Sequence, residues 1–371
     1  MARGRSCSGV GLRDKVRVLI VAPSLRFLGG QAIQAQRLCT RLRAEDWIDV
    51  ALLPVDPLLP GPFGRLQKIK FVRTIVTSIA YLGSLLRAVP RIDVVHAFSA
   101  SYWSFLLAPV PVILIGRLFG KRVLVNYRSG EAGDHLARWG WHAIPLLRLA
   151  HEIVVPSPYL VDVFHGFGLK ATVVPNFLEL DAITYRRRIR LRPRCLSNRN
   201  FEAHYNVGDI LRAFAEIEQH HPDAELTIVG DGPLRAELHS LAASLGLRRV
   251  NFVGAVRPDG MAAYYEGAEL YLNAPLIDNM PNSVIEAFAA GLPVVSSDAG
   301  GIPFIVRSGE NGLLVRAGDP EALAGAALRM LSEDGLAVRL ADAARAEATQ
   351  RYCWDAVREG WRRVYLGTDT R

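Results

Sequence analysis

Two acidic residues eight positions apart stand out in the segment DNMPNSVIEAFAAG. Asp278 precedes a helical pattern, and Glu286 lies about one turn inside it. Because proline is tolerated in the first turn of a helix, we expect this helix to begin near Pro281 or Asn282 and to end at Gly291. A carboxylate can accept hydrogen bonds from two neighbouring sugar hydroxyls. The spacing therefore predicts that the two acids hold the hydroxyls of two different sugars.

The start of the same helix is a candidate anion site. The backbone N–H groups of Asn282, Ser283 and Val284 would have no partner inside the helix, and the helix dipole adds positive potential there. A phosphate group suits such a site. The simpler alternative is that Asp278 caps the helix and Glu286 is a surface acid. The apolar residues on both sides of Glu286 argue against that alternative.

These residues need a scaffold, and the chain alternates short apolar runs with longer helical patterns. The runs, each bounded by turn residues, are VRVLIVAP, DVALLP, DVVHAF, KRVLVNY, EIVVPS, ATVVPN, RCLSNRN, AELTIVGDGP, VNFVGAV, ELYLNAP, PVVSSDAGG and GLLVRAG. Such alternation predicts parallel sheets with helices on both faces. In sheets of this kind, ligands bind beyond the carboxyl ends of the strands, where the strand order reverses.

The alternation is interrupted by TYRRRIRLRPR, which has six arginines and no apolar helical face. We interpret this stretch as the crossing between two domains. The predicted fold class is α/β, with two facing doubly wound domains and a deep cleft between them. The expected parts are a mobile tail at 1–14, a first domain at 15–180, a second domain at 181–351, and a helix at 352–368 that crosses back to the first domain.

The composition limits the class of protein and the kinds of partner and metal site to expect. The chain has 371 residues, half of them hydrophobic and 22% charged, which is typical of a globular protein with more than one core. Its net charge of +8 suits an anionic partner. No nucleic-acid-binding pattern is found, so we expect no nucleic acid partner. The four cysteines are far apart, which suggests neither a zinc site nor a disulfide framework and fits a cytoplasmic protein.

The paired acids and the loops after the other strands resemble glycosyltransferase family 4, whose members are retaining enzymes with two facing Rossmann-like domains of the GT-B type. The family more often carries Glu where this chain has Asp278. The resemblance implies transfer of a hexose-type sugar from a UDP or GDP sugar to an acceptor hydroxyl, without a metal or other cofactor. The first domain would bind a glycan or lipid-linked acceptor, as in cell-envelope, exopolysaccharide or glycolipid synthesis, and the second would bind the donor.

The resemblance also assigns roles to residues in the loops. Arg199 matches an arginine that neutralises the donor diphosphate, Tyr205 stands where the family has a lysine, and Arg128 stands where many relatives have a histidine. The expected catalytic residues are Arg128, Arg199, Asp278 and Glu286. The expected donor-binding residues are Gly29, Gly30, Tyr205, Gly230, Gly254, Val256, Asn282, Ser283 and Val284. The expected acceptor-binding residues are His96, Glu131 and His135.

The stretch 63–89 is apolar with basic residues at one end. The simpler interpretation, which we prefer at this point, is an ordinary helix of the first domain whose basic end is solvated. The alternative is a helix that lies in an anionic lipid interface, which would give peripheral contact with the inner face of the membrane.

Two other functions stay open at this point. A sugar-nucleotide epimerase could use the same scaffold, although the spacing of the two acids suits holding hydroxyls better than moving protons. A nucleotide-sugar-binding protein without catalytic activity is the other, because Tyr205, Arg128 and Phe304 each depart from the family's pattern. Donor hydrolysis in solution would separate an enzyme from such a binder.

Overall fold

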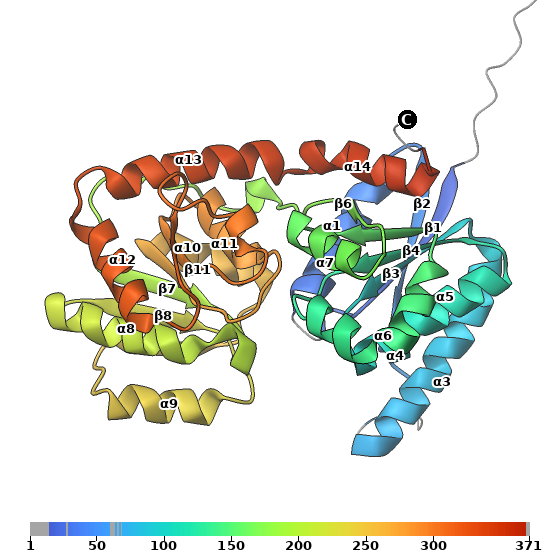
Figure 1. Cartoon of the computed structure of the whole chain (residues 1–371), viewed down its shortest axis with the longest axis horizontal. Coiled ribbons are helices and arrows are strands. Elements are labelled where there is room, and N and C mark those ends of the chain that lie inside the picture. The colour runs from blue at the N-terminus through green and yellow to red at the C-terminus, as the bar shows by residue number, and fades with distance from the viewer. Residues whose placement is uncertain (1–14, 27–28, 60–63, 65–66, 68, 369–371) are drawn as a thin grey trace, which may run out of the picture.

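The structure is a computed structural model that describes residues 15–26, 29–59, 64, 67 and 69–368. The tail expected at 1–14 lies outside the described residues. Figure 1 shows two α/β domains side by side, with the last two helices running along one side of both. We call the first sheet with the helices packed on it the first domain, and the second sheet with its helices the second domain.

The first sheet has six parallel strands in the order β2-β1-β3-β4-β5-β6. The strands are β1 (Val16–Ala22), β2 (Ile48–Pro54), β3 (Val94–Ser99), β4 (Arg122–Tyr127), β5 (Glu152–Val155) and β6 (Thr172–Val173). The α-helices are α1 (Gly30–Arg43), α3 (Lys70–Ala88), α4 (Trp103–Leu107), α5 (Pro109–Leu118), α6 (Ala132–Arg148) and α7 (Pro158–Gly166). The strand order reverses between β1 and β3.

The second sheet is also six-stranded and parallel, in the order β12-β11-β10-β7-β8-β9. The strands are β7 (Arg194–Asn198), β8 (Glu225–Val229), β9 (Val250–Gly254), β10 (Leu270–Asn273), β11 (Val294–Ser297) and β12 (Leu313–Val315). The α-helices of this half are α8 (Val207–His220), α9 (Arg235–Ser244), α10 (Met261–Gly267), α11 (Asn282–Ala289), α12 (Pro320–Ser332) and α13 (Leu336–Arg351), and α14 (Trp354–Leu366) follows them in the chain. The order reverses between β7 and β10, and the twelve predicted strands are confirmed.

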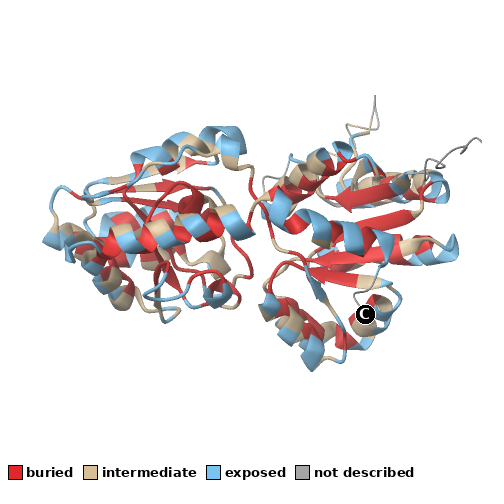
Figure 2. Ribbon diagram, turned by 90° about the horizontal axis from the view of Figure 1, so that it is seen from above, coloured by how far each residue is buried: buried red, intermediate tan, exposed pale blue. Residues whose placement is uncertain are grey.

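The apolar strand sequences follow from burial on both faces of each sheet. Val18 and Ile20 of β1 pack with α1 and α14, whereas Leu19 and Val21 pack on the other face with α3. Side chains alternate between the faces of a strand, so a strand covered on both sides needs a continuous apolar run. Figure 2 shows the buried strands between helices that are exposed only on their outer sides.

Helix α14 belongs to the core of the first domain although it ends the chain. Val357, Trp361 and Val364 pack in the same cluster as β1 and α1. The carboxylate of Glu45 accepts hydrogen bonds from the Trp354 indole at 3.2 Å and from the Arg358 guanidinium at 2.6 Å. The helix predicted at 352–368 is therefore present, and it contacts the first sheet.

The arginine-rich crossing is partly buried rather than a free linker. Arg188 is only 2% exposed, and its guanidinium donates to the carbonyl oxygens of Tyr265, Ala268 and Ala290. These carbonyls lie at the ends of α10 and α11, where helical hydrogen bonding leaves C=O groups without partners. Arg188 therefore fastens the C-terminal ends of both helices.

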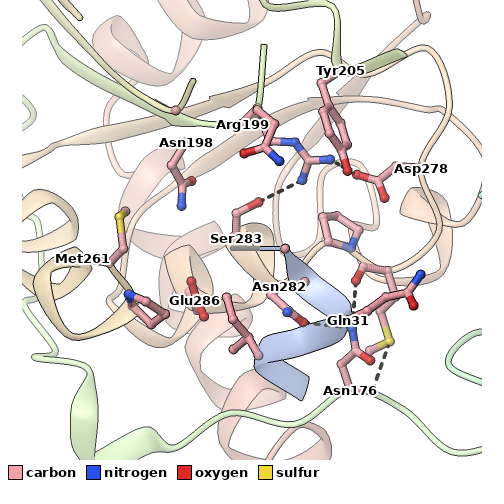
Figure 3. A pocket seen from close by; sticks show the side chains of 18 of the residues that line it. Gln31, Asn176, Asn198, Arg199, Tyr205, Met261, Asp278, Asn282, Ser283 and Glu286 are labelled. Carbon is pink, nitrogen blue, oxygen red and sulfur yellow. Dashed lines mark hydrogen bonds and ion pairs between the residues drawn. The ribbon is translucent and has the colours of Figure 1, made fainter. Parts of the chain in front are cut away.

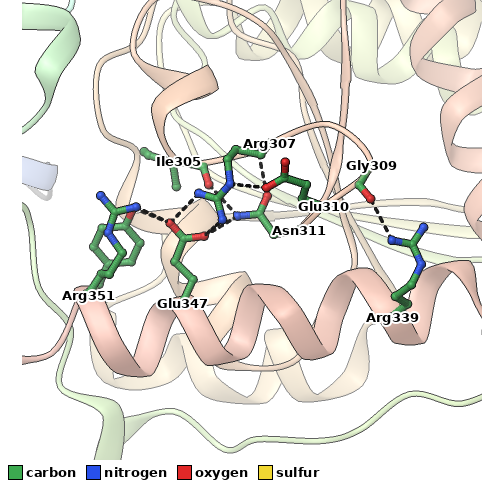
Figure 4. Close-up of polar contacts among 9 residues, drawn as sticks. Ile305, Arg307, Gly309, Glu310, Asn311, Arg339, Glu347 and Arg351 are labelled. Carbon is green, nitrogen blue, oxygen red and sulfur yellow. Dashed lines mark hydrogen bonds and ion pairs between the residues drawn. The ribbon is translucent and has the colours of Figure 1, made fainter.

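A second buried charge ties helix α13 to the segment between β11 and β12 (Figure 4). The carboxylate of Glu347 accepts two hydrogen bonds from Arg307, at 3.0 and 2.7 Å, one from Asn311 at 2.7 Å and one from Arg351 at 2.8 Å. Burial alone would raise the pKa of Glu347. The hydrogen bonds from Arg307 and Asn311 and the nearby positive charges outweigh burial, so the pKa lies below its ordinary value of 4.5.

We predict that Glu347→Gln lowers the free energy of unfolding at neutral pH by about 1–3 kcal/mol, because charge-assisted hydrogen bonds to a buried carboxylate are lost. A depressed folded-state pKa stabilises the protein above the unfolded pKa, and this stabilisation is lost as the pH falls through the folded pKa. The difference from the wild type should therefore shrink below about pH 4.5. Urea unfolding of both proteins at several pH values measures this difference in the free energy of unfolding.

Glu310→Gln is the matched control, since Glu310 pairs with the same Arg307 but its side chain is 67% exposed. It should change the free energy of unfolding by less than about 0.5 kcal/mol. Equal losses in both variants would contradict the assigned role of Glu347.

Candidate functional site

A cleft of about 900 Å³ is lined by residues of both domains. Its lining comes mainly from segments after β1, β4 and β5 in the first domain and after β7, β8, β9 and β10 in the second. Strand order reverses at β1 and β3 and again at β7 and β10. The cleft therefore occupies the place where doubly wound sheets bind ligands, and its volume suits a small molecule.

The start of α11 opens into this cleft (Figure 3). The helix begins at Asn282 after Pro281, and Gly291 follows its end with a φ of 72°, as the sequence predicts. Asn282 and Ser283 line the cleft. Val284 does not contribute a side chain, because that side chain is fully buried in the second-domain core. Only its backbone amide remains as a candidate ligand group.

Arg199 follows β7 and lies next to the start of α11. Its guanidinium donates to the Ser283 hydroxyl at 3.1 Å, forms an ion pair with Asp278, and stacks over the Tyr205 ring at 4.0 Å from the ring centroid. The residue is only 8% exposed. A guanidinium held on three sides and desolvated interacts strongly with charge in its vicinity.

The Asp278 carboxylate does not cap the helix. It accepts hydrogen bonds from Arg199 and, at 2.8 Å, from the backbone N–H of Asn279. The Asp278 carbonyl oxygen accepts from the Gly301 N–H at 3.0 Å, and a Cβ on Gly300, whose φ is 55°, would lie 2.1 Å from that oxygen. The glycine pair after β11 therefore lets the backbone approach the loop that carries Asp278.

Glu286 is not a surface acid. Its side chain is 14% exposed, and its two oxygens accept from different partners. Arg37 of α1 donates to Oε1 at 3.0 Å, and the Tyr265 hydroxyl of α10 donates to Oε2 at 2.9 Å. The carboxylate lines the cleft. It is thus a buried acceptor held in a fixed orientation by both domains.

The predicted residues at the ends of β8 and β9 differ in their roles. Gly230 and Val256 line the cleft, whereas Gly254 does not and instead accepts the Gly230 N–H at 2.9 Å. A Cβ on Gly230, whose φ is 153°, would lie 2.0 Å from the Arg199 carbonyl oxygen. This glycine lets the loop that carries Arg199 pack closely against β8.

On the first-domain side, Gly29, Gly30, Arg128 and Glu131 all line the cleft. A Cβ on Gly30, at the start of α1, would lie 3.5 Å from the Asn282 side chain at the start of α11, so the two helix starts face each other. Arg128 donates to the amide oxygens of Asn126 and Asn176. Burial lowers the pKa of Arg128 to about 9, which leaves the group charged at neutral pH.

The predicted acceptor-binding role is wrong for two residues, His96 and His135. The His96 side chain is fully buried, and its Nδ1 lies 2.7 Å from the Tyr365 hydroxyl of α14. His96 is an interior residue of β3, so it packs in the core beneath the cleft. The His135 side chain is also fully buried, and its Nδ1 lies 2.6 Å from the Tyr127 hydroxyl. It points from α6 towards β4, and neither histidine can reach an acceptor.

Sequence reasoning missed several residues of the cleft. Arg37 and Tyr265 hold Glu286, and Asn176 donates to the Asn282 side chain at 2.8 Å and accepts from Arg128. Asn198 donates to the Tyr265 hydroxyl at 2.8 Å. Arg37 lies on the same face of α1 as Gly30, which is a signal that helical periodicity could have provided.

No group of three or more His, Cys, Asp or Glu residues that could hold a metal ion is found in the described part of the chain. Cys39, Cys195 and Cys353 carry free thiols. One described helical segment, Val72–Arg91, is long and apolar enough to cross a membrane by length and composition. It comprises most of α3 and the short 3-10 helix Val89–Arg91 that follows.

Both domains match known sequence families. Residues 28–182 match Glycosyltransferase Family 4, and residues 192–333 match Glycosyl transferases group 1. A phosphatidyl-myo-inositol mannosyltransferase of Mycobacterium leprae is 33% identical over 232 residues, which are 59% of this chain and 61% of that protein. The chain therefore spans less than two thirds of the length of this relative.

Solved structures show the same fold across the chain. HepE of Anabaena, solved with UDP and glucose, superposes with a TM-score of 0.74 at 18% identity, and covers 95% of this chain and 100% of its own. Sucrose-phosphate synthase of Thermosynechococcus elongatus gives a TM-score of 0.75 at 20% identity, with the same coverage. With both domains matched in sequence and the GT-B arrangement of two Rossmann-like domains matched in structure, the chain belongs to the family 4, group 1 glycosyltransferases.

Proposed function

We propose that this protein transfers a hexose-type sugar from a nucleoside diphosphate sugar to an acceptor hydroxyl, with retention of the anomeric configuration. The observation that carries the proposal is the junction of Arg199, Ser283 and Asp278 at the start of α11, inside the cleft. The guanidinium and the first-turn amides suit a diphosphate, and Glu286 suits the hydroxyls of a ribose. HepE, which shares the fold, was solved in complex with UDP-glucose.

The charge distribution in the cleft supports an anionic ligand. Arg128 has no carboxylate partner among the residues that the structure describes, because its hydrogen bonds go to the neutral amides of Asn126 and Asn176. A half-buried cation without a counter-ion favours binding of an anion. Arg128 and Arg199 thus flank the cleft from the two domains.

In the proposed reaction the bond between the anomeric carbon and the diphosphate oxygen breaks, and a bond from that carbon to the acceptor oxygen forms on the same face. The acceptor proton passes to the leaving phosphate. Negative charge develops on the diphosphate, where Arg199, Arg128 and the amides of α11 stabilise it. Since these groups supply the positive charge, we expect turnover to persist in EDTA.

We predict that UDP or GDP raises the melting temperature of the wild type, because a ligand that binds only the folded state stabilises it by an amount that grows with its concentration over Kd. Arg199→Gln should weaken this binding, and it should lower sugar transfer or slow donor hydrolysis by about 10²–10³-fold. Thermal shift and nucleoside diphosphate release measure the two effects.

Arg329→Ala is the matched control, since Arg329 lies on α12 in an exposed ion pair with Glu333. This variant should match the wild type in nucleoside diphosphate binding and in donor turnover. Tight binding of a nucleoside diphosphate without turnover of any donor would indicate a nucleotide-sugar-binding protein without catalytic activity. If neither nucleoside diphosphate shifts the wild type, the proposed function fails.

We further propose that the protein works in the cytoplasm at the inner face of a membrane, with α3 in an anionic lipid interface. Ile75 and Ile79 of α3 are 62% and 65% exposed, and Leu82 and Leu86 continue the same exposed face. Arg73 is exposed in the first turn of the helix. The Mycobacterium leprae relative is named for a phosphatidyl-myo-inositol acceptor, which supports a lipid-linked acceptor here.

The packing of α3 favours a helix that lies in the interface over one that spans the membrane. Tyr81 and Leu85 are buried against β1 and β3 in the first-domain core, and the Tyr81 hydroxyl donates to the Ala108 carbonyl at 2.8 Å. A helix held in a core along one face can expose only the other face to lipid. The basic end of the stretch 63–89 falls partly outside the described residues, since Arg65 and Lys68 are not described.

We predict that the wild type sediments with vesicles that contain anionic lipid and less with neutral ones, and that Ile75→Ser/Ile79→Ser weakens this binding about tenfold or more through lost apolar burial. Ile189→Ser is the control, because Ile189 is 72% exposed but lies in the crossing between the domains. Equal sedimentation of all three proteins would contradict lipid contact through α3.

A further inference from the structure

We propose that Arg37 is a positioning residue for donor binding, which orients the Glu286 carboxylate from the opposite domain and so couples closure of the cleft to recognition of the donor ribose. This inference rests on the proposed function. Arg37 acts through Glu286 and the ligand rather than on the reacting atoms.

One face of α1 is built to meet the second domain. Gly30, Gln34, Arg37 and Arg41 are spaced four, three and four residues apart, which places them along one side of a helix. Gln34 donates to the Asn282 side chain at 3.0 Å, and Arg37 donates to Glu286 at 3.0 Å. The helix that begins at the glycine-rich loop thus contacts α11 at two successive turns.

The hydrogen bonds of Glu286 leave it able to hold a diol. A carboxylate has about four acceptor positions, two on each oxygen. Arg37 occupies one on Oε1, and Tyr265 occupies one on Oε2. One position on each oxygen therefore stays available, which matches two neighbouring hydroxyls. Tyr265 is fixed in turn by Asn198, so Arg37 is the part of this arrangement that depends on the first domain.

The other guanidinium nitrogen of Arg37, Nη1, is a second indication that a ligand binds here. Nη1 is buried and has no hydrogen-bond partner among the residues that the structure describes, and Arg37 lines the cleft. A buried donor without a partner costs free energy, which a ligand oxygen would recover. The Arg37 and Glu286 side chains are 17% and 14% exposed, so the pair is largely desolvated and sensitive to loss of either member.

The experiment compares two ligands, UDP or GDP and the 2′,3′-dideoxy form of the same nucleotide, by calorimetry. We expect Arg37→Ala to weaken binding of the nucleoside diphosphate about tenfold and to leave binding of the dideoxy form nearly unchanged. Arg37→Lys, which keeps the charge with fewer donors, should recover part of the loss. In the Glu286→Gln background, Arg37→Ala should add little, because the two residues act as a unit.

Arg43→Ala is the control on the same helix, since Arg43 is exposed and donates to Val50 of the first domain instead. It should bind both ligands like the wild type. Equal weakening of both ligands by Arg37→Ala and Arg37→Lys, or unchanged binding of the full nucleotide, would overturn the role of Arg37. A wild type that binds no nucleoside diphosphate would instead reject the proposed function, and this inference with it.

Discussion

The cleft depends on the burial of Arg199 at the start of α11. Taking a guanidinium out of water is costly unless hydrogen bonds and an opposite charge replace the solvent. Ser283 and Asp278 supply that replacement, and the Tyr205 ring covers one face. Asp278 lies in the loop after β10, Ser283 lies in the first turn of α11, and Tyr205 lies in the loop after β7 that also carries Arg199. The cost of leaving the cation unpaired therefore fixes the loops after β7 and β10 relative to the helix.

Several features of the sequence become intelligible from that constraint. Gly230 and Gly300 both adopt a positive φ, and a side chain at either would collide with the Arg199 or Asp278 carbonyl oxygen. Arg188 donates to carbonyl oxygens at the C-terminal ends of α10 and α11, and so fastens together the two helices that supply Tyr265 and Glu286. The backbone conformations and backbone contacts around the cleft thus constrain the sequence as well as the side chains that line it.

Much of this arrangement is predictable from sequence, because its signals are local. The twelve strands are short apolar runs that must be buried on both faces, and the bounds of α11 follow from Pro281 and Gly291. The assignment of His96 fails for a physical reason: it is three residues short of the end of β3, where a side chain still faces a core. The strand residues that line the cleft, Asn198 of β7 and Val229 of β8, are each the last residue of their strand. Helical periodicity could have placed Arg37 on the same face of α1 as Gly30, but its pairing with Glu286 was missed because the two residues are 249 positions apart and no local pattern encodes such a contact.

Tyr205, predicted from the resemblance to stand at the position of a lysine, bears on how the site handles charge. Tyr205 brings no cation, but its ring stacks on Arg199 and helps to exclude water from it. Lower local polarity strengthens each remaining interaction with an anion. Arg128 lies across the cleft at a position where the resemblance predicts a histidine, and unlike a histidine it stays charged at neutral pH. Under the proposed function, the positive charge missing at one position is supplied from the other domain, so the cleft must be closed for both cations to act on one diphosphate.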